Sequence, residues 1–305
     1  MDRTRQAVAA TVLAGLLWGS SFVVIKFGLR TIDPYWFAFL RFAVATVIAV
    51  AYAAATGRLP ALGRLLRRRI VILFGISNAI GFILQFKGQT MTTAGKAALF
   101  VNVSTIFVAV GSRFMFRERF GPLKIIAVVA GMIGVFLVTT GGRLTIASPT
   151  EFVGDMIILG GAVAWTFFIL LDKKIVHDTD VDIRALTAAQ VLLTALTALP
   201  AALLLAPRSF PAGDASWWAI LYTAVFCTII PFMLWTSGLR YITATVSSVI
   251  LLIEILFALL LAAVLLGERL TPAGIVGGGL IALAAYLATR GHVEKTAPGP
   301  DFVPE

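Results

Sequence analysis

The sequence has 305 residues, of which 59% are hydrophobic and only 13% are charged. Because soluble domains average about 25% charged residues, this composition excludes a water-soluble protein and predicts a multi-pass protein of the cell (inner) membrane. The apolar runs are long and continuous, which predicts helices, since membrane barrels show roughly ten-residue segments of alternating polarity. The net charge of +10 does not indicate a nucleic-acid partner, because the arginines lie in short loops, where basic residues orient membrane proteins.

Ten stretches are apolar over about 20 residues, the length that a helix needs to cross a bilayer. They span residues 7–29, 34–55, 70–90, 94–116, 122–141, 152–174, 184–206, 215–238, 243–266 and 272–290. The first also resembles a signal peptide, but its length favours a retained helix. Pro34, Pro122 and Pro272 stand at first-turn positions, where the missing N–H costs a helix nothing. The predicted fold class is all-α, with ten transmembrane helices.

The loops between these stretches alternate in charge. One set carries most of the basic residues, including three consecutive arginines at 67–69. The other set holds only Arg30, Arg143, Arg208 and Arg269. Because basic loops stay in the cytoplasm, we predict that both termini are cytoplasmic, with a disordered tail at 292–305.

The chain also repeats itself. TTAGKAALFVNVSTIFVAVGSRFMFRERFGP at 92–122 aligns without a gap on ITATVSSVILLIEILFALLLAAVLLGERLTP at 242–272, and residues 81–88 align with 231–238 at the same offset. Trp18 aligns with Trp165. We therefore predict two five-helix repeats at 1–145 and 146–291. An odd number of spans in each makes the second repeat enter the membrane upside down, an architecture of secondary transporters whose site lies between the halves.

The motifs WGSSFVVIKFGL, FLRFAVA, TTAGKAALFVNV and GERLTP, in this order, resemble the EamA-type members of the drug/metabolite transporter superfamily. The resemblance covers nearly the whole chain. It implies a carrier with two inverted five-helix halves and a central cavity, and it implies no particular substrate. Members of the family often have proline in the fourth span and a Glu-Pro pair in the ninth, whereas Glu254 is followed here by Ile255. A proline break in those two helices is therefore not predicted.

The third span has a polar stripe. Asn78, Gln85 and Gln89 recur at spacings of seven and four and share one helical face with Phe82. A polar face in lipid points inward. Two interpretations stay open, namely hydrogen bonds to a substrate and hydrogen bonds between helices.

The corresponding face of the eighth span carries Phe232 and Trp235. Pro231 interrupts this helix, and Gly81 stands at the equivalent place in the third span. Paired interruptions of this kind indicate a transporter site, and the alternative is a tolerated kink. We take both aromatic residues as substrate-binding candidates.

Trp18 and Trp165 are too deep for the aromatic belt at the membrane surface, so they are candidates for cavity walls, with plain packing as the alternative. Ser21 shares the face of Trp18 and offers a hydroxyl. Lys96 and Arg41 could bind an anionic group, although for Arg41 the preferred interpretation is a structural helix anchor.

Glu254 lies about midway through the ninth span, where a charge costs at least about 2.5–3.5 kcal/mol on insertion scales. Its predicted role is to bind a proton or a cationic substrate group during transport, and the alternative is a structural acid held by hydrogen bonds.

These features predict a secondary transporter, by preference an exporter of small metabolites such as amino acids, and not an enzyme. The alternatives are a membrane enzyme acting on lipid-linked substrates and a non-transporting sensor. The sequence shows no metal-ligand cluster or phosphate-binding loop, so no cofactor or metal is expected. The expected partners are a small-molecule substrate, the lipid bilayer and protons. Gly274 and Gly278 form a small-residue pattern that suits packing within a monomer or a homodimer face.

Overall fold

The computed structural model describes residues 3–28, 31–92, 94–143, 148–178, 181–206, 214–266 and 271–296. Every regular element in these ranges is a helix, which confirms the predicted all-α class. The first half contains α1 (Arg3–Gly28), α2 (Pro34–Ala55), α3 (Leu59–Leu66), α4 (Arg69–Gln89), α5 (Ala94–Asn102), α6 (Ser104–Met115) and α7 (Pro122–Thr140). The second contains α8 (Pro149–Asp178), α9 (Ile183–Leu205), α10 (Asp214–Ala224), the π-helix η1 (Val225–Ile229), α11 (Ile230–Leu239), α12 (Ala244–Leu251), α13 (Ile253–Leu266) and α14 (Pro272–Thr296).

The helices begin where the local sequence favours a helix start. The Asp33 carboxylate accepts from the backbone N–H of Tyr35 at 2.8 Å, directly before Pro34. Asp182 caps α9 in the same way through the backbone N–H groups of residues 184 and 185. At the end of α7, Gly141 adopts a positive φ of 64°, a conformation that glycine takes at no steric cost.

Two spans are broken although neither contains the proline that family members often have. α5 gives way to α6 at Val103, and α12 to α13 at Leu252. At both places a backbone hydrogen bond reaches back three residues instead of four. The N–H of Val103 donates to the carbonyl of Phe100, and the N–H of Leu252 donates to that of Val249. The local switch to tighter winding, rather than proline, ends each first segment.

Nine helical stretches in the described part of the chain are long and apolar enough to cross a membrane. They correspond to the predicted spans from 34–55 onward, and α1 is not among them, so the count of ten stays a prediction. The short helix α3 was not predicted. α14 runs on to Thr296, which makes the start of the predicted tail at 292–296 helical, and residues 297–305 lie outside the described part.

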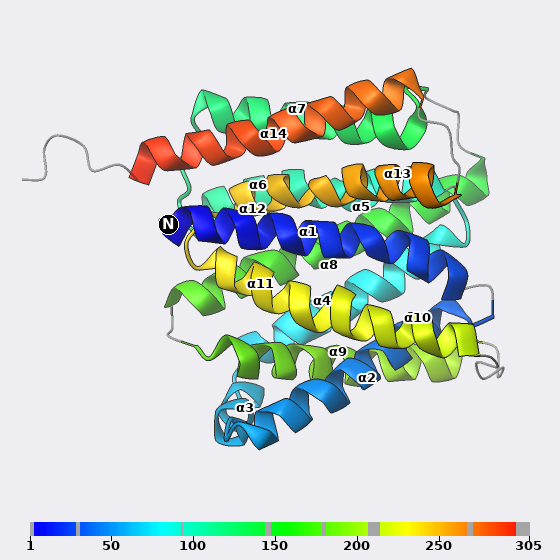
Figure 1. Ribbon diagram of the computed structural model, residues 1–305, viewed down its shortest axis with the longest axis vertical. Coiled ribbons are helices and arrows are strands. Elements are labelled where there is room, and N and C mark those ends of the chain that lie inside the picture. Colours follow the sequence, from blue (N-terminus) through cyan, green and yellow to red (C-terminus); the bar gives the residue numbers. More distant parts are fainter. Residues whose placement is uncertain are drawn as a thin grey trace, which may run out of the picture.

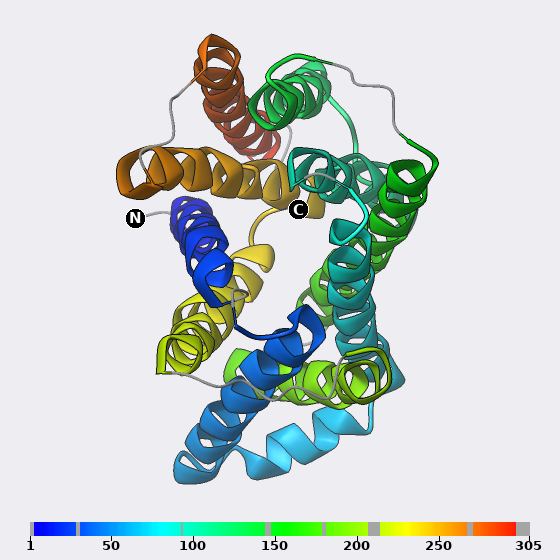
Figure 2. The ribbon, with the colours of Figure 1, turned by 90° about the vertical axis from the view of Figure 1, so that its right-hand side faces the viewer.

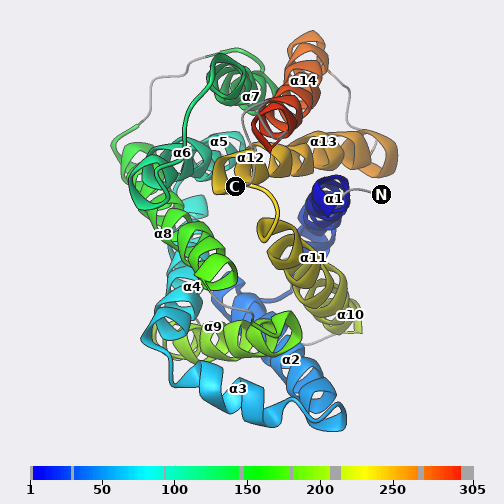
Figure 3. The same ribbon diagram turned by 90° about the vertical axis from the view of Figure 1, so that its left-hand side faces the viewer.

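The helices lie side by side along one direction (Figure 1). Seen along that direction, α1 and α11 form one wall, and α4 and α8 form the opposite wall (Figures 2 and 3). α12 and α13 lie with α5 and α6 across one edge, while α2 and α9 lie across the other. α7 and α14 pair outside this arrangement, with backbones so close that a Cβ at Gly134 would lie 2.7 Å from the carbonyl oxygen of Gly277. The small-residue contact of α14 therefore uses Gly277, between the two glycines that the sequence singled out.

Candidate functional site

Two pairs of aromatic rings join neighbouring helices at corresponding places in the sequence. Trp18 of α1 meets Phe232 of α11 edge to face, with ring centroids 5.3 Å apart. Trp165 of α8 meets Phe82 of α4 in the same manner, also at 5.3 Å. The two tryptophans correspond in the alignment of the halves, and so do the two phenylalanines. Four predicted substrate-binding residues thus form two pairs of matching geometry, an arrangement that aromatic rings favour.

Phe168 of α8 connects the two walls. Its ring stacks on Trp235 at 5.5 Å and meets Phe232 edge to face at 5.8 Å. Trp235 is fully buried and donates from Nε1 to the Ser247 hydroxyl at 2.8 Å. Phe168 was not predicted, because its neighbours Phe167 and Ile169 are equally apolar and nothing in the sequence distinguishes it from them.

A π-helical turn in the eighth span frees a backbone carbonyl. The turn η1 ends at Ile229, two residues before Pro231. Pro231 has no N–H and cannot bond to the carbonyl four residues earlier, that of Cys227. This carbonyl instead accepts from Trp18 Nε1 at 3.1 Å and from Arg41 Nη2 at 3.2 Å. The predicted interruption at Pro231 therefore creates an acceptor where α1, α2 and η1 meet, and π-helical turns are frequent at functional sites.

Arg41 carries a buried positive charge at this junction, with only 3% of the residue exposed. Its Nε donates to the Thr228 hydroxyl at 2.8 Å. Its guanidinium lies over the rings of Phe42 and Phe82, 5.1 Å from each centroid. No acidic side chain in the described ranges forms an ion pair with it, and Nη1 makes no hydrogen bond there. The sequence favoured Arg41 as a structural helix anchor, with anion binding as the alternative, and gave no sign of its aromatic and carbonyl partners.

Trp165 rests on Gly81, the residue that corresponds to Pro231. A Cβ at position 81 would lie 2.5 Å from Trp165 Nε1, so any larger residue would displace the indole. Unlike Trp18, Trp165 makes no hydrogen bond through Nε1 with a described residue. The two predicted interruptions thus place their tryptophans in different ways: Pro231 frees a bonding partner and Gly81 makes room.

The polar residues of the α4 stripe differ in their contacts: one takes part in helix packing and another makes no hydrogen bond with the described residues. Asn78 is buried and donates from Nδ2 to the Thr194 hydroxyl of α9 at 3.1 Å, which is the helix-packing arrangement. Gln85 is half-buried and makes no hydrogen bond with the described residues. On α1, the Ser21 hydroxyl donates to the carbonyl of Trp18 at 2.6 Å. Asn78 and Ser21 would have to exchange these bonds to contact a substrate, whereas Gln85 would not.

Lys96 lies at the end of the bundle where α4 ends and α8 begins. Its Nζ donates to Glu151 of α8 at 2.8 Å. Close by, the Thr92 hydroxyl donates to Asp155 at 2.6 Å. These contacts hold the α4–α5 connection against α8. The structure therefore does not bring Lys96 together with the aromatic pairs, and its predicted substrate contact would require breaking the ion pair with Glu151.

Glu254 lies in the first turn of α13, directly after the break at Leu252. The N–H groups at a helix start carry partial positive charge, which favours a carboxylate there. α1 passes so close that a Cβ at Gly19 would lie 2.6 Å from the Glu254 carbonyl oxygen. The residue is half-buried, and its carboxylate forms no ion pair or hydrogen bond within the described ranges. Its roles in coupling and in structure both stay predictions.

A buried polar network joins α8 to α11 at the end of the bundle where α11 stops. Lys173 Nζ donates to the carbonyls of Leu239 and Ile242 at 2.6 and 3.0 Å. The Thr236 hydroxyl donates to the neighbouring Asp172 at 2.7 Å. Because an ammonium group is favourable against the free carbonyls at a helix end, this network holds the two walls together there. α8 continues past this network to Asp178, and both Asp172 and Lys173 are buried.

Among the described residues, no group of three or more His, Cys, Asp or Glu side chains is arranged to hold a metal ion. The site so far consists of aromatic walls, one buried guanidinium, a free amide and a carboxylate at a helix start. Such a set can bind a small organic molecule, and it contains no nucleophile paired with a base.

Comparison with known families assigns the chain to one of them. The model of the EamA-like transporter family matches twice, over residues 5–140 and 152–290. The chain belongs to this family. The predicted resemblance is thereby confirmed, and the protein is a multi-pass membrane protein of a transporter family. Membership implies a lipid bilayer and a small-molecule substrate, and it argues against a membrane enzyme.

Similar proteins span nearly the whole chain. An uncharacterized transporter of Archaeoglobus fulgidus is 27% identical, over 94% of this chain and 98% of its own. A Salmonella typhimurium protein named a probable amino-acid metabolite efflux pump is 30% identical, over 94% and 96%. An uncharacterized inner membrane transporter of Escherichia coli is 26% identical, over 90% and 88%. A solved crystal structure superposes with a TM-score of 0.82 at 20% identity, over 95% and 99%, and shares the fold.

Proposed function

We propose that the protein is a secondary transporter of the inner membrane that exports small metabolites bearing a carboxylate, such as amino acids. It works by alternating access of two inverted halves. Support for the class of substrate comes from the Salmonella relative named a probable amino-acid metabolite efflux pump. Support for the inverted halves comes from the matching pairs Trp18–Phe232 and Phe82–Trp165.

The observation that carries this proposal is the buried guanidinium of Arg41. A charge in the middle of a membrane costs at least about 2.5–3.5 kcal/mol on insertion scales. Its present partners are a hydroxyl, a carbonyl and two aromatic faces, which solvate the charge without neutralising it. A substrate carboxylate would do both, through the free Nη1 and a charge-assisted hydrogen bond.

The aromatic residues provide the walls of the proposed site. Trp18, Phe232 and Trp235 lie on the α1–α11 wall, and Phe82 and Trp165 on the α4–α8 wall. Such rings offer apolar contact area for side chains of different sizes. Gln85, with its free amide, is the proposed polar contact on α4, while Ser21, Asn78 and Lys96 join only if they exchange their present partners.

Glu254 is the proposed coupling residue. It binds a proton from the side of higher proton concentration and releases it on the other side as the halves exchange access. Its place at the break in the ninth span supports this, because a broken helix can change the surroundings of its first turn without unfolding. A carboxamide in its place keeps the shape but cannot ionise.

The test uses purified protein in proteoliposomes. We expect uptake of radiolabelled L-amino acids to exceed uptake of the corresponding amines, which lack the carboxylate, by at least about tenfold. Arg41→Gln should lower amino-acid transport by about 10- to 100-fold and remove this preference, while Arg41→Lys retains part of it. Arg113→Gln, at an exposed arginine of α6, is the control.

Glu254→Gln should retain exchange of substrate between the two sides and lose accumulation driven by a pH gradient. Equal uptake of amino acids and amines by the parent protein would refute carboxylate recognition. Absence of any substrate-dependent flux across the whole set of acids and amines would refute the transport proposal itself. Unchanged accumulation in Glu254→Gln would refute proton coupling through this residue.

A further inference from the structure

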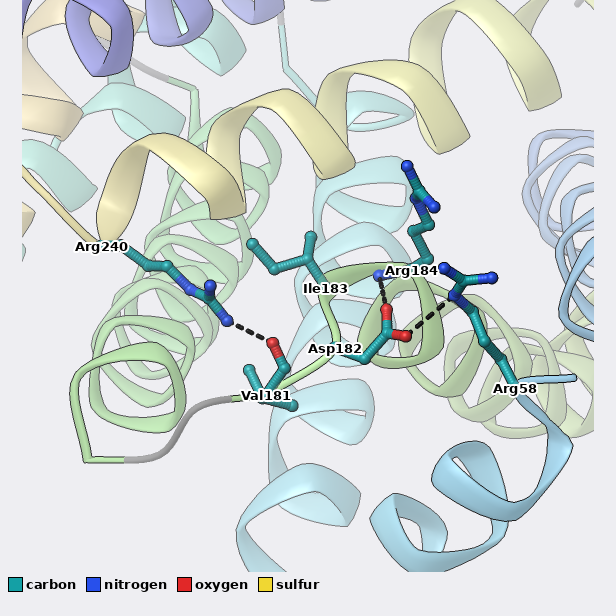
Figure 4. A pocket seen from close by; sticks show the side chains of 6 residues that line it. All are labelled: Arg58, Val181, Asp182, Ile183, Arg184 and Arg240. Atoms are coloured by element: carbon teal, nitrogen blue, oxygen red, sulfur yellow. Dashed lines mark hydrogen bonds and ion pairs between the residues drawn. The ribbon is translucent and has the colours of Figure 1, made fainter. Parts of the chain in front are cut away.

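The helices α2 and α9, which lie across one edge of the bundle, run side by side in opposite directions. Arg58 lies just beyond the end of α2, and its Nε donates at 2.9 Å to Asp182, the residue that caps the start of α9 (Figure 4). Arg240, at the end of α11, lies across the same pocket. The end of α2 and the start of α9 therefore meet at the end of the bundle where α11 stops. The two helices also begin alike, because Asp33 caps α2 as Asp182 caps α9.

Gln190 takes the place in α9 that Arg41 takes in α2. Each lies eight residues after the aspartate that caps its helix, so the two are 149 positions apart. Offsets of 147 and 150 relate the tryptophans and the phenylalanines of the two aromatic pairs. Both Gln190 and Arg41 are buried, at 1% and 3% exposure. Because the two helices are antiparallel and rise about 1.5 Å per residue, Gln190 lies about 10 Å closer than Arg41 to the end where α11 stops.

Gln190 belongs to a polar stripe of α9. Thr187, Gln190 and Thr194 recur at spacings of three and four, so they share one face of the helix. All three are at most 2% exposed. The Thr194 hydroxyl accepts from Asn78 Nδ2 at 3.1 Å, and Asn78 begins the polar stripe of α4 that leads to Gln85. The two stripes therefore meet, and together they form a line of polar side chains from the aromatic pairs toward the end where α11 stops.

Two members of the α9 stripe are buried without a hydrogen bond. Neither Gln190 Nε2 nor the Thr187 hydroxyl has a partner among the described residues. Other buried threonines, such as Thr11 and Thr223, donate to the carbonyl four residues earlier in their own helix. An unpaired polar group in a buried place is costly, and an apolar side chain of the same shape would be more stable there. Stability therefore does not explain why two such groups lie within one turn.

We propose that Thr187 and Gln190 form a second site for the substrate carboxylate, occupied when the transporter is open toward the end where α11 stops. This proposal rests on the proposed function, in which Arg41 binds the same carboxylate. The Gln190 amide and the Thr187 hydroxyl are donors that suit carboxylate oxygens, and they bring no second charge into the bundle. They bind the carboxylate more weakly than the forked guanidinium of Arg41 does. The substrate exchanges between the two sites as the halves exchange access.

The test measures uptake of a radiolabelled L-amino acid, and of the corresponding amine, into right-side-out and inside-out membrane vesicles that contain the full-length protein. The variant Thr187→Val/Gln190→Leu replaces both polar groups with apolar side chains of similar shape. From the face where α11 stops, which is the cytoplasmic face by the predicted orientation, we expect the half-saturating concentration of the amino acid to rise at least about tenfold. From the other face it should change by less than about twofold, and amine uptake should not change.

Stability separates a role in binding from a role in packing. The unfolding temperature of the purified double variant should equal or exceed that of the parent, since the removed N–H and hydroxyl groups have no partner within the described ranges. Thr187→Ser keeps the hydroxyl and should retain the parental half-saturating concentration within about twofold. Thr11→Val, the control, removes a buried hydroxyl that is bonded within its own helix, and it should likewise leave that concentration unchanged.

The outcomes distinguish this proposal from the proposed function. If the parent protein prefers amino acids to amines and the double variant retains the parental half-saturating concentrations, the second site is refuted and the proposed function stands. An equal rise from both faces, or a rise from the opposite face alone, would also overturn a second site at this depth. A parent protein without any preference for amino acids over amines would refute carboxylate recognition itself, and this proposal with it.

Discussion

Glu118 and Lys124 form an ion pair whose removal should have a measurable cost. Both residues are buried, at 7% and 4% exposure, and their side chains are 2.5 Å apart. Glu118 lies between α6 and α7, and its second oxygen accepts from the Thr245 hydroxyl of α12 at 3.0 Å. The structure thus pairs Glu118 with Lys124 and connects the first half of the chain to the second through Thr245.

The magnitude follows from the distance and the burial. At 2.5 Å and an effective dielectric constant near 20, the attraction is about 6–7 kcal/mol before the cost of removing both charges from water. Losing one partner leaves the other buried without compensation, which costs about 3–5 kcal/mol. We therefore expect Glu118→Gln and Lys124→Met each to lower the free energy of unfolding by about 3 kcal/mol. The double variant removes both charges and should cost no more than either single one.

The assay is unfolding of the purified protein in detergent, followed by tryptophan fluorescence, for the parent and the three variants. The difference between the double variant and the sum of the single variants gives the coupling energy, expected at about 3 kcal/mol. A double variant that costs the sum of the two single ones would show that the charges do not interact, and would refute this reasoning.

The same pair predicts the pH dependence. Burial alone would raise the pKa of Glu118, but the hydrogen bond and the charge of Lys124 outweigh it, and the pKa lies below the ordinary value of 4.5. A carboxyl group with a lowered pKa in the folded state stabilises the protein fully above the unfolded value. That contribution is lost as the pH falls below 4.5 toward the folded pKa. The loss should be absent in the double variant.

Three further predictions concern the helices. In a cysteine-free background, a cysteine at Arg143 should react with an impermeant thiol reagent from outside the cell and one at Gly63 should not; the reverse pattern would overturn the predicted orientation. Pro231→Ala restores an N–H that competes for the π-turn carbonyl, so transport should fall at least about tenfold while the protein still folds, and parental transport would contradict the role of the turn. Lys173→Met removes one of the two polar links between α8 and α11, so a cysteine at the buried Ser247 should become labelled several-fold faster by a permeant reagent. An unchanged rate would show that the Lys173 link does not hold this end closed.

The helices could be predicted from the sequence because, in lipid, every backbone N–H and C=O group must form a hydrogen bond within the protein. Nine of the predicted spans coincide with candidate membrane-crossing helices within a few residues. The first residues of several helices could be predicted from the local sequence, as with Pro34 after Asp33 and Pro122 after Gly121. The breaks at Val103 and Leu252 were not predictable, because no single residue type causes them. Each depends on the bonding of its own turn.

The sequence could indicate candidate residues for the site, but it could not indicate their contacts. Aromatic residues at equivalent places, as with Trp18 and Trp165, could be recognised from the repeat. Hydrogen-bond partners could not, because they depend on which helices pack together. The sequence therefore could not show that Asn78 would bond to Thr194, while Gln85 would have no hydrogen-bond partner in the described part of the chain. Lys96 was a reasonable anion-binding candidate by type, but its partner Glu151 is 55 residues further along the chain.

The two walls of the site resemble each other in shape and differ in how firmly they are held. On the first wall, Trp18 is fixed by the Cys227 carbonyl, which also holds Arg41. On the second, Trp165 lies on Gly81 and its indole N–H makes no hydrogen bond within the described ranges. Groups that are already bonded are preorganised and lose little entropy on binding, whereas unbonded groups can adjust to a ligand. We infer that the first wall fixes the part shared by all substrates, the carboxylate, and that the second accommodates the parts that vary. In the proposed transporter of several related metabolites both are needed, and the two predicted repeats, which have proline at one interruption and glycine at the other, would provide them within a single fold.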